Sequence, residues 1–125
     1  MKINEHLILL DIGNNGIGND GSKAIFEALH TEQGTSNRTL SRTKLEKLLL
    51  SNNRITAGRI VTIVTRLKRN RTLTMVDLSL NIQDKEERIE ENYIRINQEI
   101  QELQQYRHKN KKQMNLSTQI EILWQ

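Results

Sequence analysis

The chain of 125 residues contains no cysteine, few aromatic residues and no long apolar run. Without cysteine there is no disulfide framework and no cysteine-based zinc site, and this fits a reducing compartment, so we expect a cytoplasmic location. The N-terminus lacks a charged segment followed by an apolar one, and no run of about eighteen apolar residues occurs, so we expect neither secretion nor a membrane span. A hydrophobic content of 35% with only 3% aromatic residues is low for a compact globule.

Catalytic and metal-binding motifs are also missing from the sequence. The histidines His6, His30 and His108 are scattered, and none stands at a ligand or dyad spacing from another histidine or a carboxylate. No nucleophile elbow, phosphate-binding loop or paired-carboxylate arrangement appears. We therefore expect a protein that is not an enzyme and that has no metal or cofactor.

What the chain does contain is one pattern written three times. Residues 7–15, 45–53 and 73–81 share the form L-x-x-L-x-L-x-x-N, in which isoleucine or valine replaces one leucine in the first and third copies. The last two copies begin 28 residues apart (73 − 45), a normal length for one strand plus one helix, and the first two begin 38 apart (45 − 7). The extra residues, near 31–44, are rich in Thr, Ser, Arg and Gly and are predicted to form an exposed loop.

This pattern resembles the leucine-rich repeat, in particular the long repeats of ribonuclease inhibitor and of NOD-like receptors. The resemblance covers roughly residues 4–83. It implies a parallel strand on a concave face, a turn held by the asparagine and a helix on the convex face. It also implies protein–protein binding without catalysis. The chain departs from the family in having only three copies and in carrying Gln83 where Ile17 and Ile55 stand in the other copies.

The residues of each copy support the same reading on physical grounds. Successive side chains of a strand point to opposite faces, so the spaced leucines are predicted to enter the core and the residues between them to face outward. These outward positions are the candidate partner-binding surface, because an exposed apolar patch edged by charge usually marks a contact site. They are Leu9, Asp11, Gly13, Lys47, Leu49, Ser51, Met75, Asp77 and Ser79. The asparagines Asn15, Asn53 and Asn81 are predicted to satisfy backbone groups at the bend.

After the first two copies the apolar spacing changes to the helical period. One predicted helical stripe consists of Ile17, Gly21, Ala24, Ile25, Ala28 and Leu29, and the other of Ile55, Ile60, Ile63, Val64 and Leu67. A single strand–helix unit cannot bury its apolar face, whereas about three stacked units can. The predicted fold is a short α/β solenoid with a long C-terminal helix.

A glycine motif follows the first predicted strand. Gly16–Gly21 has the spacing G-x-G-x-x-G between a predicted strand and a predicted helix, as in dinucleotide-binding turns. Such a fold needs a second strand that ends in an acidic residue, and more sheet than this chain can hold. The equivalent segment Asn53–Gly58 lacks the motif. We therefore attribute the glycines to the tight turn.

Residues 84–125 are predicted to form a helical tail, separate from the repeats of residues 1–83. Asp84–Glu87 has the form of a capping box, and we predict a helix from about Asp84 to His108. Its apolar residues recur at spacings of four and three, which indicates either self-pairing as a short coiled coil or a capping helix packed on the last repeat. These candidate oligomerisation residues are Ile89, Tyr93, Ile96, Ile100 and Leu103.

The last segment of the chain fits two structures. Ile120, Leu123 and Trp124 would share the face of a helix, whereas Ile120, Ile122 and Trp124 would share the face of a strand.

Charge is distributed unevenly along the chain. Residues 37–71 contain ten basic residues and one acidic residue, a net charge of +9 (10 − 1), although the whole chain is only +4. We call the basic residues of this segment the basic rim, and their charge favours an acidic protein partner. Nucleic acid is a weaker expectation, because none of the aromatic residues Phe26, Tyr93, Tyr106 and Trp124 interleaves with the basic ones.

The sequence as a whole predicts a protein-interaction module that binds a partner through the concave strand face and the basic rim. One alternative is a fragment of a larger NOD-like receptor or regulatory repeat protein. Another is a scaffold that oligomerises through the tail and displays the repeats.

Overall fold

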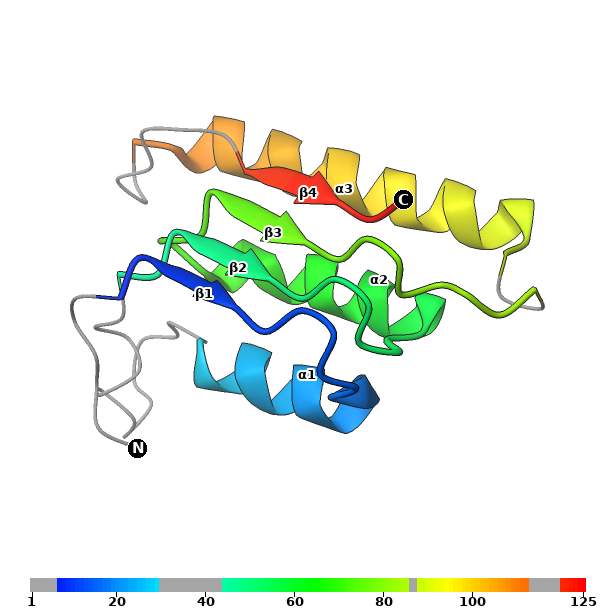
Figure 1. Cartoon of the computed structure of the whole chain (residues 1–125). Helices are drawn as coiled ribbons and strands as arrows, with labels where there is room; N and C mark the ends of the chain where they lie inside the picture. Colours follow the sequence, from blue (N-terminus) through cyan, green and yellow to red (C-terminus); the bar gives the residue numbers. More distant parts are fainter. Residues whose placement is uncertain (1–6, 30–43, 86–87, 113–119) are drawn as a thin grey trace.

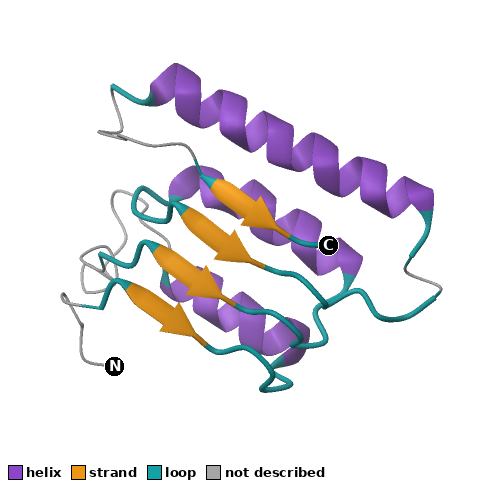
Figure 2. Ribbon diagram, turned by 45° about the horizontal axis from the view of Figure 1, so that its top comes forward, coloured by secondary structure: helices purple, strands orange, loops and turns teal. Residues whose placement is uncertain are grey.

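A computed structural model of the chain, described over residues 7–29, 44–85, 88–112 and 120–125, shows a mixed α/β fold (Figure 1). Four strands form one parallel sheet in the order β1-β2-β3-β4, which is also their order along the chain. The helices cover one face of this sheet, and no described element covers the other face (Figure 2). The elements are β1 (Leu9–Asp11), α1 (Gly18–Ala28), β2 (Lys47–Leu49), α2 (Ala57–Arg66), the 3-10 helix η1 (Leu67–Arg69), β3 (Met75–Asp77), α3 (Glu90–Asn110) and β4 (Glu121–Leu123).

The core lies between the sheet and the helices, and the repeated leucines supply most of it. Leu48 of β2 and Val76 of β3 are fully buried, as are Leu50 and Leu78 directly after these strands, because both strands have a neighbour on each side. Leu10 and Ile12 are only partly buried, because β1 lies at the edge of the sheet. The predicted inward direction is therefore confirmed for these residues, whereas Leu7, the first leucine of the first copy, is exposed.

Helix α2 follows the sequence prediction closely. The hydroxyl oxygen of Thr56 accepts a hydrogen bond from the backbone N–H of Arg59 and so caps the helix. All the predicted stripe residues are buried, at Ile55, Ile60, Ile63, Val64 and Leu67. The spacing in this segment was sufficient to define the buried face.

The predicted stripe of α1 is only partly correct. Ser22, Phe26 and Leu29 are buried, whereas Ala24, a predicted stripe residue, is exposed. α1 lies at the end of the helical layer, so only the side that faces the sheet and α2 is covered (Figure 1). The sequence did not indicate which side of α1 would be covered, because several residues of the predicted stripe are small.

Helix α3 begins at Glu90, later than the predicted start at about Asp84. Ile89 has an extended backbone, and the Nε of Arg88 donates a hydrogen bond to the carbonyl oxygen of Ile82 at 3.1 Å. This bond holds the preceding segment against the β3 turn, so the segment is a connection and not a first helical turn. The proposed capping box falls partly outside the described residues.

The C-terminal segment forms a strand, β4, and not a helix. β4 pairs with β3 in parallel, with Val76 opposite Ile122, and Ile120 and Trp124 are buried in the common core. α3 therefore connects two neighbouring strands of one sheet and packs against α2. The division at residues 83 and 84 stays a prediction about domain organisation, but β4 and β3 share a sheet across it.

Two further sequence expectations concern parts of the chain with limited description. The loop predicted near 31–44 lies outside the described residues except for Lys44, as do His6 and His30. Among the described helices, none is both long enough and apolar enough to cross a membrane.

Candidate functional site

The uncovered face of the sheet carries six of the predicted partner-binding residues in two straight rows, because the four strands are parallel and in register. The other predicted residues, Gly13, Ser51 and Ser79, follow the strand ends and lie outside these rows. The first row runs from β1 to β4 through Leu9, Lys47, Met75 and Glu121. The second row runs through Asp11, Leu49, Asp77 and Leu123. We call these eight residues the open face.

Apolar and charged side chains alternate on the open face in both directions. Along each row an apolar residue is followed by a charged one, and along each strand the two residues of the face are again one apolar and one charged. Leu9 and Leu123 are 46% and 39% exposed at the two edges, whereas Leu49 and Met75 are half-buried between neighbours. The face therefore offers separated apolar contacts and not one continuous apolar patch.

The charge of the open face is opposite to that of the basic segment. It contains one basic residue, Lys47, and three acidic ones, Asp11, Asp77 and Glu121, a formal net charge of −2 (1 − 3). The repeated pattern predicted Asp11, Lys47 and Asp77 on this surface but not Glu121, because the last segment fitted a helix as well as a strand.

The two aspartates also fold the turns that follow their strands. The Oδ1 atom of Asp11 accepts a hydrogen bond from the backbone N–H of Gly13, and that of Asp77 accepts one from the N–H of Ser79, each at 2.9 Å. Gly13 lies against Ser51, whose hydroxyl oxygen would be 3.0 Å from a Cβ atom at position 13. These short contacts fix the carboxylates of β1 and β3 relative to the backbone.

The predicted structural role of the repeated asparagines is confirmed. The backbone N–H of Asn15 donates to the Oδ1 of Asn53 at 2.9 Å, and the N–H of Asn53 donates to the Oδ1 of Asn81 at 2.7 Å. In return, the Nδ2 of Asn53 donates to the carbonyl of Ile12 and the Nδ2 of Asn81 to that of Leu50. Asn53 and Asn81 thus satisfy the bend of the preceding repeat, whereas the side chain of Asn15 bonds to its own turn, and none of the three is a partner-contact candidate.

A second ladder at the same bend explains the departure at Gln83. Asn14 and Asn52 have positive φ angles of 62° and 53°, and the Nδ2 of Asn52 donates to the Oδ1 of Asn14 at 2.6 Å. The third repeat has Leu80 at this position, also with a positive φ, of 59°. The Nε2 of Gln83 donates to the Oδ1 of Asn52 at 2.7 Å and so replaces the missing asparagine.

Leu80 stands at the ladder position without an amide side chain, and its backbone carbonyl accepts a hydrogen bond from the Nε2 of Gln83 at 2.9 Å. It is 63% exposed and lies in the left-handed region, which asparagine tolerates and leucine does not favour. With Tyr93 and Trp124 it lines a small pocket of about 260 Å³ at the ends of β3 and β4. The signal in the sequence that could have singled out Leu80 is its alignment with Asn14 and Asn52.

The predicted oligomerisation stripe of α3 is mostly used inside the chain. Ile96 and Leu103 are fully buried, and Tyr93 and Ile100 pack against the core. Of the five stripe residues only Ile89 is exposed, ahead of the helix. This arrangement corresponds to the second of the two interpretations, a helix packed on the last repeat, because the apolar side chains that a coiled coil would need are covered.

Arg107, one helical turn after Leu103, continues this stripe as a buried charge. In α3, the Nη1 of Arg107 donates to the carbonyl oxygen of Leu73 at 2.6 Å and its Nη2 to that of Asn70 at 3.0 Å. Desolvation by burial lowers the pKa of Arg107 to about 10. The guanidinium is therefore still charged at neutral pH and holds the segment between η1 and β3 against α3.

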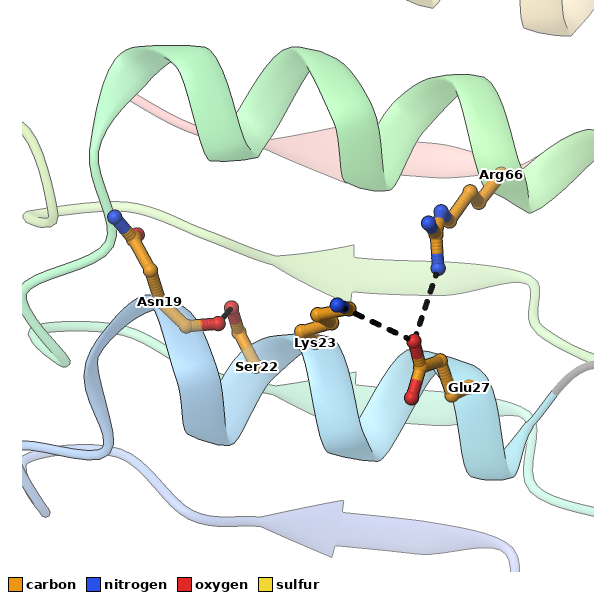
Figure 3. Close-up of polar contacts among 5 residues, drawn as sticks. All are labelled: Asn19, Ser22, Lys23, Glu27 and Arg66. Atoms are coloured by element: carbon orange, nitrogen blue, oxygen red, sulfur yellow. Dashed lines mark hydrogen bonds and ion pairs between the residues drawn. The ribbon is translucent and has the colours of Figure 1, made fainter.

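The basic residues of segment 37–71 that the structure describes do not form a single patch. Lys47 lies on the open face, whereas Arg66 belongs to α2 in the helical layer and forms an ion pair of 3.7 Å with Glu27 of α1 (Figure 3). Glu27 also pairs with Lys23 at 3.8 Å within α1 (Figure 3). Lys68 lies 6.0 Å from the ring centre of Tyr106. The basic residues that are close in sequence thus point to different sides of the molecule.

The described residues show no group of histidine and acidic side chains that could hold a metal ion. No family model matches this chain, and neither the curated proteins nor the solved structures include one that matches it. Any function must therefore be argued from the geometry of the chain itself.

Proposed function

We propose that this chain is a short leucine-rich-repeat solenoid that binds a protein partner through the open face. The parallel strands, the helices on one side only and the two asparagine ladders support the repeat assignment. The single observation that carries the binding role is the open face itself, where four apolar and four charged side chains lie in register with no described element over them.

The open face fits a partner surface that combines apolar and basic groups. Its net charge of −2 attracts cations, and Asp11 and Asp77 are held in place by their own turns, so little side-chain freedom would be lost on pairing. An acidic or carbonyl group of the partner would face Lys47, whose strand lies between those of Asp11 and Asp77. This proposal revises the acidic partner expected from the basic rim, because the basic side chains do not converge on this face.

The experiment is a selection of short displayed peptides on immobilised protein. Enriched peptides are expected to carry basic and apolar residues together and to bind less tightly as salt rises. The double variant Leu49→Lys/Glu121→Lys changes the net charge of the open face from −2 to +1 (−2 + 1 + 2) and should lose these peptides with an unchanged circular dichroism spectrum. Gly58→Lys, at an open position on α2, is a matched control that adds a positive charge away from the open face.

Retention of the selected peptides by the double variant would contradict the assignment of the site, and enrichment of acidic peptides would contradict the proposed partner chemistry.

A further inference from the structure

The two outer strands of the sheet, β1 and β4, have complementary edges. In a parallel ladder, alternate residues direct their backbone groups to opposite neighbours. The carbonyl of Ile8 accepts from Lys47 of β2 and the N–H of Ile12 donates to β2, so the backbone groups of Leu9 and Asp11 are directed outward. No described strand pairs with this outer side of β1.

The edge of β4 has the opposite parity. The N–H of Glu121 donates to the carbonyl of Thr74, and the carbonyl of Leu123 accepts from Leu78, so both residues are directed to β3. The backbone groups of Ile122 are then directed outward. β4 therefore offers to a following strand what β2 offers to β3, and β1 can receive it as β3 does, through positions 9 and 11 in place of 75 and 77.

The side chains match in the same register. If β1 of a second copy followed β4, its Leu9 would lie opposite Glu121 and its Asp11 opposite Leu123. The alternation of apolar and charged residues along both rows would continue across the junction, and no two like charges would be opposed. Charge complementarity thus permits this particular pairing.

The helical layer allows the same translation. α1 and α3 lie at opposite ends of the layer, with α2 between them (Figure 1), so the shift that places β1 beyond β4 also places α1 beside α3. α3 exposes Ile94, at 49%, and α1 exposes the small residue Ala24, which permits close approach of a neighbouring helix.

We propose that copies of this chain associate head to tail, with the outer edge of β4 in one copy paired to the outer edge of β1 in the next. The junction repeats the register of β2 with β3. Such a heterologous contact does not close on itself by symmetry, so assemblies should grow beyond a dimer as concentration rises. The edges of both strands, three residues each, are short, so the association is weak and concentration-dependent.

A charge exchange across the junction tests this register on the full chain. Leu9→Glu places a carboxylate beside Lys47 of its own sheet, which favours folding, but opposite Glu121 of the neighbouring copy. We expect about two- to fivefold weaker association, measured as average mass against concentration by sedimentation equilibrium. The double variant Leu9→Glu/Glu121→Lys restores an opposite-charge pair and should recover or exceed the association of the unmodified chain.

Two further variants keep the result interpretable. Leu9→Pro removes an outward N–H from an edge position, which a strand tolerates, and should lower the association constant by about tenfold. Gly58→Glu adds the same charge as Leu9→Glu, away from both edges, and should leave association unchanged. Circular dichroism confirms that each variant is folded.

Three results would overturn the proposal. They are a monomer at every concentration, a mass that stops at the dimer, or a double variant that stays as weak as Leu9→Glu.

Discussion

At the scale of single residues, the turns depend on a few side chains that serve neighbouring repeats, and Asn53 is the clearest example. It is fully buried, accepts hydrogen bonds from the N–H groups of Asn15 and Ile17, and donates to the carbonyl of Ile12. The repeated asparagine and its role could be predicted from sequence, because a polar residue at a fixed place in an apolar pattern has a backbone function. The direction of the ladder, from each repeat to the preceding one, needed the structure.

Asn53→Ala should be destabilising, because it leaves the partly buried backbone groups of Ile12, Asn15 and Ile17 without this partner. We expect a loss of about 2–4 kcal/mol in the free energy of unfolding, measured by urea denaturation. Asn15→Ala is the matched control: its side chain is exposed and bonds only to its own turn, so its loss should stay below about 1 kcal/mol. Equal losses in the two variants would show that the ladder across repeats adds nothing.

Leu80 adopts a left-handed backbone conformation that leucine does not favour. Replacement by asparagine, the residue at the aligned positions, should relieve left-handed strain and raise stability by about 1 kcal/mol, seen as a higher Tm. Leu123→Asn, on an exposed strand position with no positive φ, should give no such gain. A lower Tm for Leu80→Asn would mean that Leu80 makes packing contacts that outweigh the strain.

At the scale of elements, periodicity predicted the type and the buried face of an element better than its first and last residues. The repeated pattern placed β1, β2 and β3, the buried stripe of α2 and the outward residues, because alternation and the helical period depend only on local geometry. β4 could not be predicted in the same way. It lies 46 residues (121 − 75) after β3 and has Trp124 where the other copies have leucine or isoleucine. Its pairing is a long-range contact that a local pattern does not contain.

Arg107 makes a contact of α3 that the sequence did not predict. A charged residue near a helix end is usually solvated, but Arg107, in the last turns of α3, is buried and donates hydrogen bonds to two carbonyl groups. Arg107→Ala should lower the free energy of unfolding by about 3 kcal/mol, because both carbonyls lose their donor. Arg95→Ala, an exposed arginine of the same helix, should change it by less than about 0.5 kcal/mol.

The pH dependence of this contribution follows from the pKa. Burial lowers the pKa of Arg107 to about 10, so the unfolded chain retains the proton of this residue to higher pH than the folded chain does. Stability linked to this group is therefore constant below about pH 10 and rises only between that value and the unfolded one. The loss in Arg107→Ala should accordingly be the same on both sides of neutrality, and a loss that varied there would contradict this assignment.

At the scale of the whole molecule, strands that are distant in sequence build one surface. Leu9, Lys47, Met75 and Glu121 come from four strands and line up only because the sheet is parallel and in register. Three of these strands supplied candidate residues from the sequence, whereas the charge of the complete surface emerged only with β4. The described residues of the basic rim lie on different sides of the molecule, because helix residues point in several directions. A count of charges along the chain does not reveal this.

The proposed function requires the open face to be the binding surface, and methyl NMR of the chain with a selected basic and apolar peptide tests this directly. The methyl signals of Leu9, Leu49, Met75 and Leu123 should shift together with increasing peptide, while those of Ile25 and Ile94 in the helical layer stay unchanged. Shifts confined to Ile25 and Ile94, with the four open-face signals unmoved, would contradict the proposed function.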